Sequence, residues 1–196
     1  MDHVVSSPEL FPHLRIVMGM VIGLGITRLL TGVAGFIQHP QRAKPYPVHL
    51  FWVASLLLEL VEFWWWQFKL FDVSDWSFLT FCFIIAYSII LYLIAALLFP
   101  DNVTEYNGYE GFFMSRRKWF FSLYASTFVF DLFDSMLKGG EYFSRFGYEY
   151  IIEVPVGIAL CAIAIWTPNR RYHYWLALLH LIYQVGVIGR LYYTAT

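Results

Sequence analysis

Two glutamates three residues apart are the side chains of this sequence best placed to do chemistry. Glu59 and Glu62 stand within LLLELVEFWWWQF, residues 56–68, among leucine, valine, phenylalanine and tryptophan. Residues three or four apart share one face of a helix, so the two carboxyls are expected on the same face. Carboxyls placed in this way inside an apolar helix are typical of sites that relay protons or attract cations.

Further polar residues follow the same spacing along later apolar segments. Such stripes favour a protein interior or a water-filled cavity over contact with lipid. The candidate ion pathway or polar core therefore comprises Arg28, Glu59, Glu62, Asp131, Asp134, Glu153, His180, Gln184 and Arg190.

A rise of about 1.5 Å per residue sorts these side chains into two expected layers. Arg28, Glu59 and His180 are predicted near the midplane of the membrane. The outer layer is predicted to be acidic with one cation nearby, and it comprises Glu62, Asp131, Asp134, Glu153 and Arg190.

The purpose of these charges is open to three interpretations, since one acid at a helix centre opposes insertion by about 3 kcal/mol. Ion pairs, such as Arg28 with Glu59 or Arg190 with an outer acid, could fix helix packing. Alternatively, the carboxylates relay protons or cations, while Arg28 and His180 set the midplane barrier or titrate near neutral pH. The third interpretation is a ligand pocket or an enzyme site inside the membrane.

Sequence motifs give little support to an enzyme. The chain has no Gly-x-Ser-x-Gly, no His-Glu-x-x-His and no Cys–His arrangement typical of hydrolases. Glu59-x-x-Glu62 and Asp131-x-x-Asp134 could bind a divalent cation between two helices, so metal binding stays open. His49 and His173 make a bis-histidine haem conceivable. We nevertheless expect no cofactor.

The elements that must position these residues are membrane helices. The chain is 59% hydrophobic and 14% charged, whereas a soluble domain carries roughly a quarter charged residues. Its apolar blocks run to about twenty residues, the length that crosses a bilayer. We predict an all-α, polytopic integral membrane protein forming one domain over 1–196, with six transmembrane helices in a bundle. The expected spans are about 14–37, 48–71, 76–99, 119–137, 148–166 and 172–193.

The second, fourth and sixth helices should face inward, and the third should be largely structural or lipid-facing. The first carries small residues at every fourth position, which let helix backbones approach closely in lipid. A sharper interpretation is that missing side chains leave space for a ligand or water beside Arg28. The candidate packing residues are Gly19, Gly23, Thr27, Thr31 and Gly35.

Charge and length indicate orientation and partners. The gaps after the first, third and fifth spans hold more Lys and Arg than the opposite side, which favours both termini outside a cell (inner) membrane. A net charge of −1 gives no reason to expect nucleic acid. Besides the lipid bilayer, we expect further copies of the chain in a homo-oligomer, because six short helices enclose little volume. A protein partner is also possible.

The leading functional hypothesis is a proton or cation channel or transporter. The alternative is a non-catalytic membrane subunit or sensor that packs against a partner, with the charges as structural ion pairs. The runs GLGITRLLTGVAGFIQ, VHLFWVASLLLELVEFWWWQF and LYLIAALLFP resemble small, uncharacterised bacterial multi-span membrane proteins over most of the chain. That resemblance implies a bacterial membrane protein, but it brings no activity and no site residue.

Overall fold

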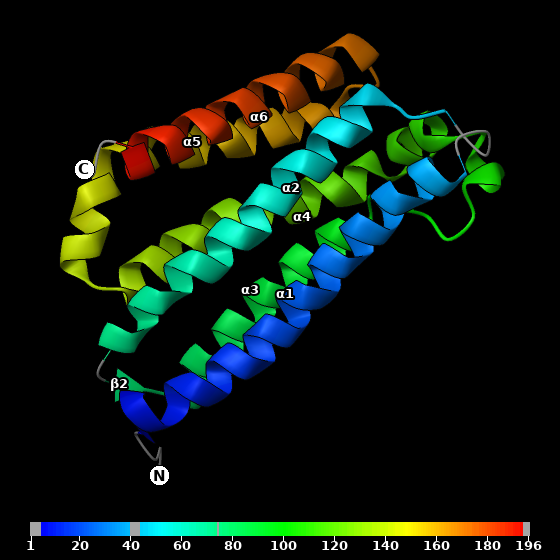
Figure 1. The fold of residues 1–196 in the computed structure, drawn as a ribbon. Coiled ribbons are helices and arrows are strands. Elements are labelled where there is room, and N and C mark those ends of the chain that lie inside the picture. Colours follow the sequence, from blue (N-terminus) through cyan, green and yellow to red (C-terminus); the bar gives the residue numbers. More distant parts are fainter. Residues whose placement is uncertain (1–4, 40–43, 74, 194–196) are drawn as a thin grey trace.

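The computed structural model describes residues 5–39, 44–73 and 75–193. Within them the chain runs up and down as long helices joined by short connections (Figure 1). The elements are β1 Val5–Ser6, α1 Ser7–Gln38, α2 Pro47–Trp66, the 3₁₀ helix η1 Gln67–Asp72, β2 Asp75–Trp76, α3 Phe78–Ala96, the 3₁₀ helix η2 Val103–Tyr106, α4 Tyr109–Leu137, α5 Gly140–Trp166 and α6 Arg170–Tyr193.

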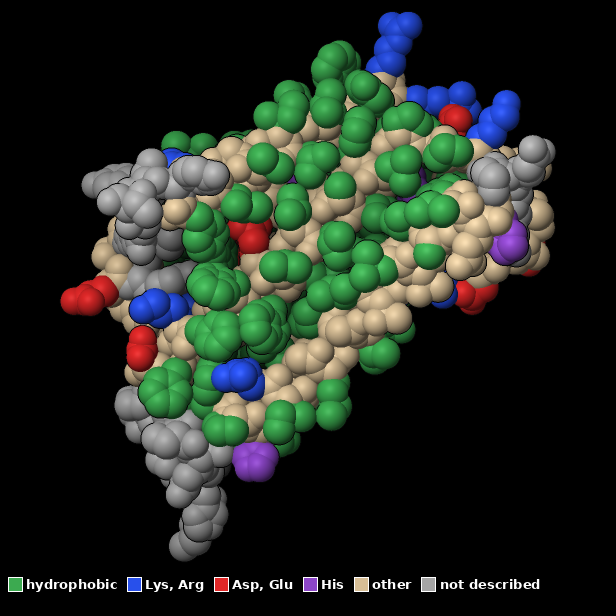
Figure 2. Space-filling view, viewed as in Figure 1, with side chains coloured by type: hydrophobic (Ala, Val, Ile, Leu, Met, Phe, Trp, Pro, Cys, Tyr) green, Lys and Arg blue, Asp and Glu red, His purple; other side chains and the backbone are tan. Residues whose placement is uncertain are grey.

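All six long helices have the length and apolar composition needed to cross a membrane. Large apolar side chains also cover much of the outside, as the green belt in Figure 2 shows. Phe78 is 82% exposed and Trp166 is 84% exposed, which suits contact with lipid rather than water. These observations confirm the predicted all-α class with six helices.

The helices pack as neighbouring pairs, with α1 along α3, α4 along α5 and α2 along α6. Trp52 of α2 fills the contact between three helices, because its ring meets Phe120 and Tyr124 of α4 and His180 of α6. The third helix carries no charge, burying one face around Leu91 and exposing the other. The core thus holds α2, α4 and α6 against one another.

Local sequence signals explain where these helices begin and turn. Pro47 stands at the start of α2, where a missing N–H costs nothing. Ser77 caps α3 by accepting a hydrogen bond from the backbone N–H of Thr80 at 3.1 Å. Gly139, with φ of 103°, makes the turn between α4 and α5, a conformation that side chains disfavour.

The fourth helix is longer than the sequence predicts. We expected it to begin near Trp119, but α4 begins at Tyr109 and its 29 residues span about 43 Å. The basic residues 116–118 lie within it instead of preceding it, since long cationic side chains can reach the headgroup zone from a helix. The fifth helix also starts earlier than expected, at Gly140 rather than near Tyr148.

The ends of α1, α3 and α5 lie at one end of the bundle, opposite the N-terminal end (Figure 1), and the basic residues 116–118 of α4 and Arg170 and Arg171 of α6 follow close to that end. An ion pair between Arg170 and Glu110, at 2.6 Å, ties the start of α6 to the start of α4 there. At the other end, β1 pairs antiparallel with β2, which fastens the N-terminal segment to the α2–α3 connection.

Candidate functional site

A cavity of about 140 Å³ opens between α2, α4, α5 and α6. It unites most of the polar core that the sequence singles out, including side chains from both expected layers. Its lining includes Glu59 and Glu62 of α2, Asp131 of α4, Glu153 of α5, and His180 and Gln184 of α6.

The rest of the lining is mainly aromatic, and its described residues include no Lys or Arg. Tyrosines come from three of the helices, with Tyr124 on α4, Tyr150 on α5 and Tyr183 on α6. Trp66, Phe63 and Phe128 complete the aromatic walls. Four carboxyls therefore share one cavity with mainly aromatic walls.

A chain of hydrogen bonds begins at the innermost carboxyl. The Tyr124 hydroxyl donates to Oε2 of Glu59 at 3.0 Å and lies 2.8 Å from Nε2 of His180. Because that hydroxyl gives its only proton to Glu59, it must accept from Nε2–H of the histidine. Nδ1 of His180 then accepts from the hydroxyl of Ser55 at 3.2 Å. These contacts suit a neutral imidazole that carries its proton on Nε2, and they join the four groups into one hydrogen-bonded chain.

The other three carboxyls also meet neutral donors. Nε2 of Gln184 donates to Glu62 at 3.3 Å. Asp131 accepts from the hydroxyl of Tyr150, and Glu153 accepts from that of Tyr183. A neutral donor stabilises a carboxyl without cancelling its charge, so a carboxyl of this cavity that ionises keeps a negative charge that a cation could neutralise.

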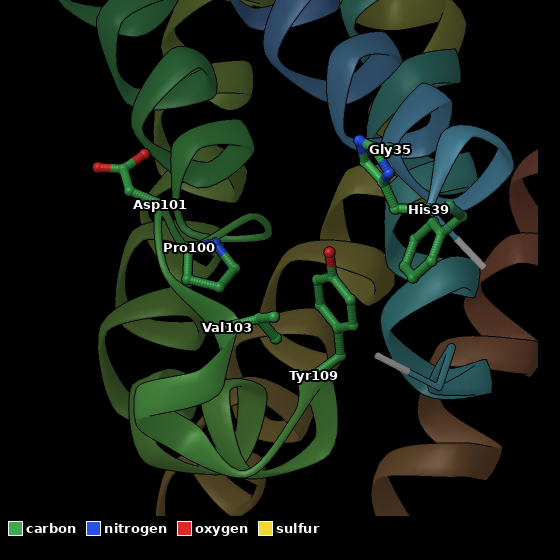
Figure 3. A pocket seen from close by; sticks show the side chains of 7 residues that line it. Gly35, His39, Pro100, Asp101, Val103 and Tyr109 are labelled. Carbon is green, nitrogen blue, oxygen red and sulfur yellow. The ribbon is translucent and has the colours of Figure 1, made fainter. Parts of the chain in front are cut away.

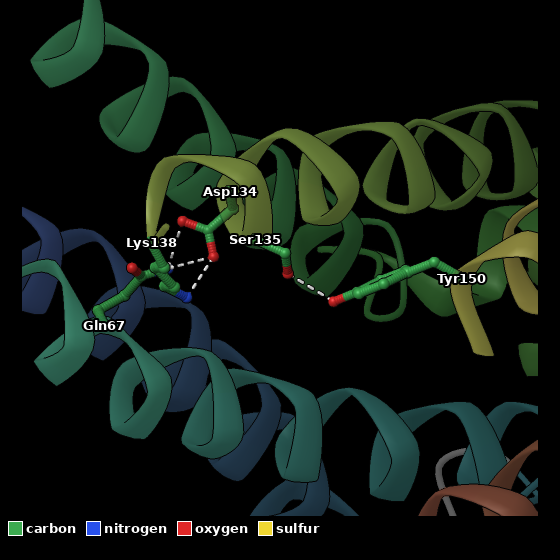
Figure 4. A network of polar contacts seen from close by, with 5 residues as sticks. All are labelled: Gln67, Asp134, Ser135, Lys138 and Tyr150. Atoms are coloured by element: carbon green, nitrogen blue, oxygen red, sulfur yellow. Dashed lines mark hydrogen bonds and ion pairs between the residues drawn. The ribbon is translucent and has the colours of Figure 1, made fainter. Parts of the chain in front are cut away.

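Asp134 lies beside the cavity rather than in its lining. It is buried together with Lys138, one turn further along α4, and the two form an ion pair. Nε2 of Gln67 approaches both carboxylate oxygens at 3.3 and 3.4 Å (Figure 4). Ser135 contacts the Tyr150 hydroxyl at 2.5 Å, which connects this network to the cavity wall.

Arg190 forms an ion pair with Glu149 of α5 at 2.8 Å, on the exposed side of the same end. The sequence indicated an outer acid as its partner but did not single out Glu149. That residue stands four positions before Glu153, so helical spacing from a known candidate could have found it. Helical spacing would also have found Tyr150, three residues before Glu153, and Tyr183, three residues after His180.

Arg28 does not join Glu59 and His180. Its guanidinium donates to the carbonyl oxygen of Phe99 and pairs with Asp101, each at 2.6 Å. The expected midplane set is therefore not formed as predicted. The physical reason is that α1 continues past the end of α3, so a residue ten positions before the end of α1 lies level with the α3–α4 connection.

A second, smaller cavity of about 70 Å³ lies next to this ion pair, between the last turns of α1 and the residues that follow α3. Figure 3 shows Asp101 on the opposite side of that space from Gly35 and His39, with its carboxyl pointing away from both. The space beside Arg28 that the sequence suggested for a ligand is thus small.

The small-residue stripe on α1 is open within the chain. A Cβ atom added at Gly19, Gly23 or Gly35 would meet no atom within 4 Å, and Thr27 and Thr31 are exposed. Close packing uses the other glycines, because a Cβ on Gly32 would lie 2.4 Å from the Phe99 ring. A contact at the stripe would need a second molecule, so its packing role stays a prediction.

His49 and His173, the two histidines that made a haem conceivable, form hydrogen bonds with the backbone. Nε2 of His49 contacts the carbonyl oxygen of Leu98, and Nε2 of His173 contacts that of Thr167 at 3.0 Å. Across the described part of the chain, no three His, Cys, Asp or Glu side chains are grouped to hold a metal ion.

Comparison of the chain with known protein families, with curated proteins and with solved structures finds no match. The resemblance to small multi-span proteins agrees with the six apolar helices, but bacterial origin gains no support. The fold and the site define the class only broadly: six helices able to cross a membrane suggest an integral membrane protein, and four of them enclose a carboxyl-lined cavity.

Proposed function

We propose that the protein is a cation channel or transporter in which this cavity binds the ion, with protons among the ions it moves. One observation carries the proposal: Glu59, Glu62, Asp131 and Glu153 line one space with no Lys or Arg among the lining residues that the structure describes. Such an array creates a negative potential that attracts cations. Burying it would oppose insertion by roughly 10 kcal/mol if each acid cost about 3, which favours a use for the charges.

The hydrogen-bonded chain gives protons a route from the cavity. Glu59, Tyr124, His180 and Ser55 are each within 3.2 Å of the next polar atom. A proton delivered to Glu59 can be passed on as each hydroxyl or ring nitrogen donates to one neighbour and accepts from the other. The proton first binds to one of the other cavity carboxyls, those of Glu62, Asp131 and Glu153, and then passes to Glu59.

We place the protein in a cell (inner) membrane with both termini outside. The distribution of Lys and Arg supports this orientation, because residues 116–118 of α4 and Arg170 and Arg171 of α6 stand near the opposite end. The cavity lies in the C-terminal halves of α2 and α4. In this orientation it would lie in the outer half of the membrane.

The test is flux in proteoliposomes that contain a pH-sensitive dye and carry a potassium–valinomycin potential. Native protein should conduct protons above empty liposomes, and Glu59→Gln/Glu62→Gln should lose that flux. Glu141→Gln is the matched control, because Glu141 is exposed outside the cavity. Equal flux in the native and double-variant proteins, or none above empty liposomes from folded native protein, would refute the proposal.

A second candidate is a non-catalytic membrane subunit or sensor, alone or as a homo-oligomer. The observation in its favour is the open stripe of Gly19, Gly23 and Gly35, where a partner helix could approach the α1 backbone closely. In this case the replacement of Gly19 and Gly23 by leucine should abolish assembly while leaving the isolated chain folded.

A further inference from the structure

We propose that the cavity binds a small organic ammonium ion, of the kind that choline represents. This inference rests on the proposed function, because it names the class of cation that the same cavity takes. It is carried by a combination that neither acids nor aromatics provide alone: four carboxyls and six aromatic side chains line a single space.

The aromatic lining surrounds the cavity from all four of its helices. Phe63 and Trp66 come from α2, Tyr124 and Phe128 from α4, Tyr150 from α5 and Tyr183 from α6. A cation held over such rings within about 6 Å gains roughly 2 kcal/mol or more when water is excluded. Quaternary ammonium groups are the ligands that aromatic cages recognise best.

The carboxyls favour a diffuse cation over a compact metal ion. A hard metal ion needs several oxygen ligands converging within about 2.6 Å. Among the residues that the structure describes, no three His, Cys, Asp or Glu side chains form such a group. An ammonium ion spreads its charge over an alkyl surface, so it can use carboxyls that lie apart on four helices.

Gln184 supplies a further acceptor. Its Nε2 donates to Glu62, while its buried Oε1 has no hydrogen-bond partner within the described residues. A buried acceptor without a donor costs free energy, about 1–3 kcal/mol. An ammonium N–H or the hydroxyl of a choline-like ligand would satisfy it.

Size and access agree with a small ligand. The cavity volume of about 140 Å³ corresponds to roughly five water molecules at about 30 Å³ each, which is enough for a trimethylammonium group. Figure 2 shows an acidic side chain at the surface within the apolar belt. An ion with an alkyl surface can reach such a place from the membrane, whereas a strongly hydrated metal ion cannot.

Equilibrium binding tests the inference. Native protein in nanodiscs of phosphatidylglycerol, prepared without choline lipids or choline-based detergents, is titrated calorimetrically with choline. The same titration uses 3,3-dimethylbutan-1-ol, the neutral isostere that replaces the charged nitrogen by carbon. Choline should bind, and the isostere should bind at least about tenfold more weakly, because it keeps the shape and loses the charge.

A matched pair of variants isolates the aromatic contribution. Trp66→Leu and Trp66→Phe both lose the indole N–H bond to Tyr192, but only the phenylalanine keeps an aromatic face. Choline affinity should fall about tenfold in Trp66→Leu and stay within about threefold of native in Trp66→Phe. Equal losses in the two folded variants would contradict the aromatic role.

Repeating the titration in phosphatidylcholine discs separates two sources of the same chemistry. Unchanged affinity indicates a free ammonium solute, and weaker affinity indicates competition from the lipid headgroup; both outcomes support an ammonium site. Absence of choline binding to folded native protein, or equal binding of the isostere, overturns the inference. Choline binding without ion flux would remove the transport proposal alone, and flux without choline binding would remove only the ligand class.

Discussion

His180 and Glu59 are joined through one hydroxyl, that of Tyr124, which lies 2.8 Å from the imidazole and 3.0 Å from the carboxyl. No other side chain is recorded bridging the two within the described residues. The hydroxyl proton of Tyr124 therefore lies on the path between the imidazole and the carboxyl. This relationship makes the tyrosine hydroxyl a more selective target than either of the groups that it joins.

Tyr124→Phe should abolish proton flux while leaving the cavity shape intact, because the substitution removes one oxygen and breaks the relay. The measurement is proton flux in the dye-loaded proteoliposomes described above. Tyr172→Phe is the control, since it removes a hydroxyl that donates to the carbonyl of Leu160 away from the cavity. Proton flux equal to native in Tyr124→Phe would show that protons do not pass through this hydroxyl.

Lys138→Met should destabilise the fold strongly. The side chains of Lys138 and Asp134 are 1% and 2% exposed, so the substitution leaves a buried carboxylate without its cation, at a cost of about 3–5 kcal/mol. Thermal unfolding in a mild detergent measures the change. The double variant Lys138→Met/Asp134→Leu should recover most of the loss.

The exposed pair Lys69–Asp72, with side chains 62% and 68% exposed, is the comparison. Lys69→Met should change stability by at most about 1 kcal/mol, because water screens that pair. A similar shift from both single substitutions would mean that burial does not determine the strength of the Asp134 pair.

Sequence reasoning succeeded where one physical rule dominates. Bilayer thickness dictates helix length, and helical spacing places Glu59 and Glu62 on one face, so six helices and most of the cavity acids were predictable. It failed for Arg28 because depth was counted from the end of α1, which continues beyond α3. Tyr150 and Tyr183 stand at helical spacing from Glu153 and His180, but the chain has 14 tyrosines, and the spacing does not show which of them contact an acid.

Gly32→Ala and Gly23→Ala should differ in stability. A Cβ at Gly32 would lie 2.4 Å from the ring of Phe99 and force it to move, costing about 1–3 kcal/mol. A Cβ at Gly23 would meet no atom within 4 Å of the chain, so the monomer should tolerate it. Thermal unfolding in detergent compares the two variants. Equal destabilisation would mean that α1 and the residues after α3 do not pack as described.

Assembly tests the open face of α1 separately. Gly19→Leu/Gly23→Leu should leave unfolding of the isolated chain unchanged, since a Cβ atom at either position would meet no atom of the described residues within 4 Å. If copies associate through this face, the double variant should shift the mass measured in detergent from oligomer to single chain. An oligomer that survives the substitution would exclude this face as the interface.

Single-cysteine labelling tests the orientation on which the position of the cavity depends. In a chain whose Cys82 and Cys161 are replaced by serine and alanine, one cysteine is placed at Glu105 or at Ser144, both exposed and at opposite ends of the bundle. An impermeant maleimide added to intact cells should label position 144 and leave position 105 unlabelled until the membrane is opened. The reason is that the basic residues near that end, which are residues 116–118 of α4 and Arg170 and Arg171 of α6, favour the cytoplasmic side. Labelling of position 105 alone would reverse the orientation, and the carboxyl-lined cavity would then face the cytoplasm.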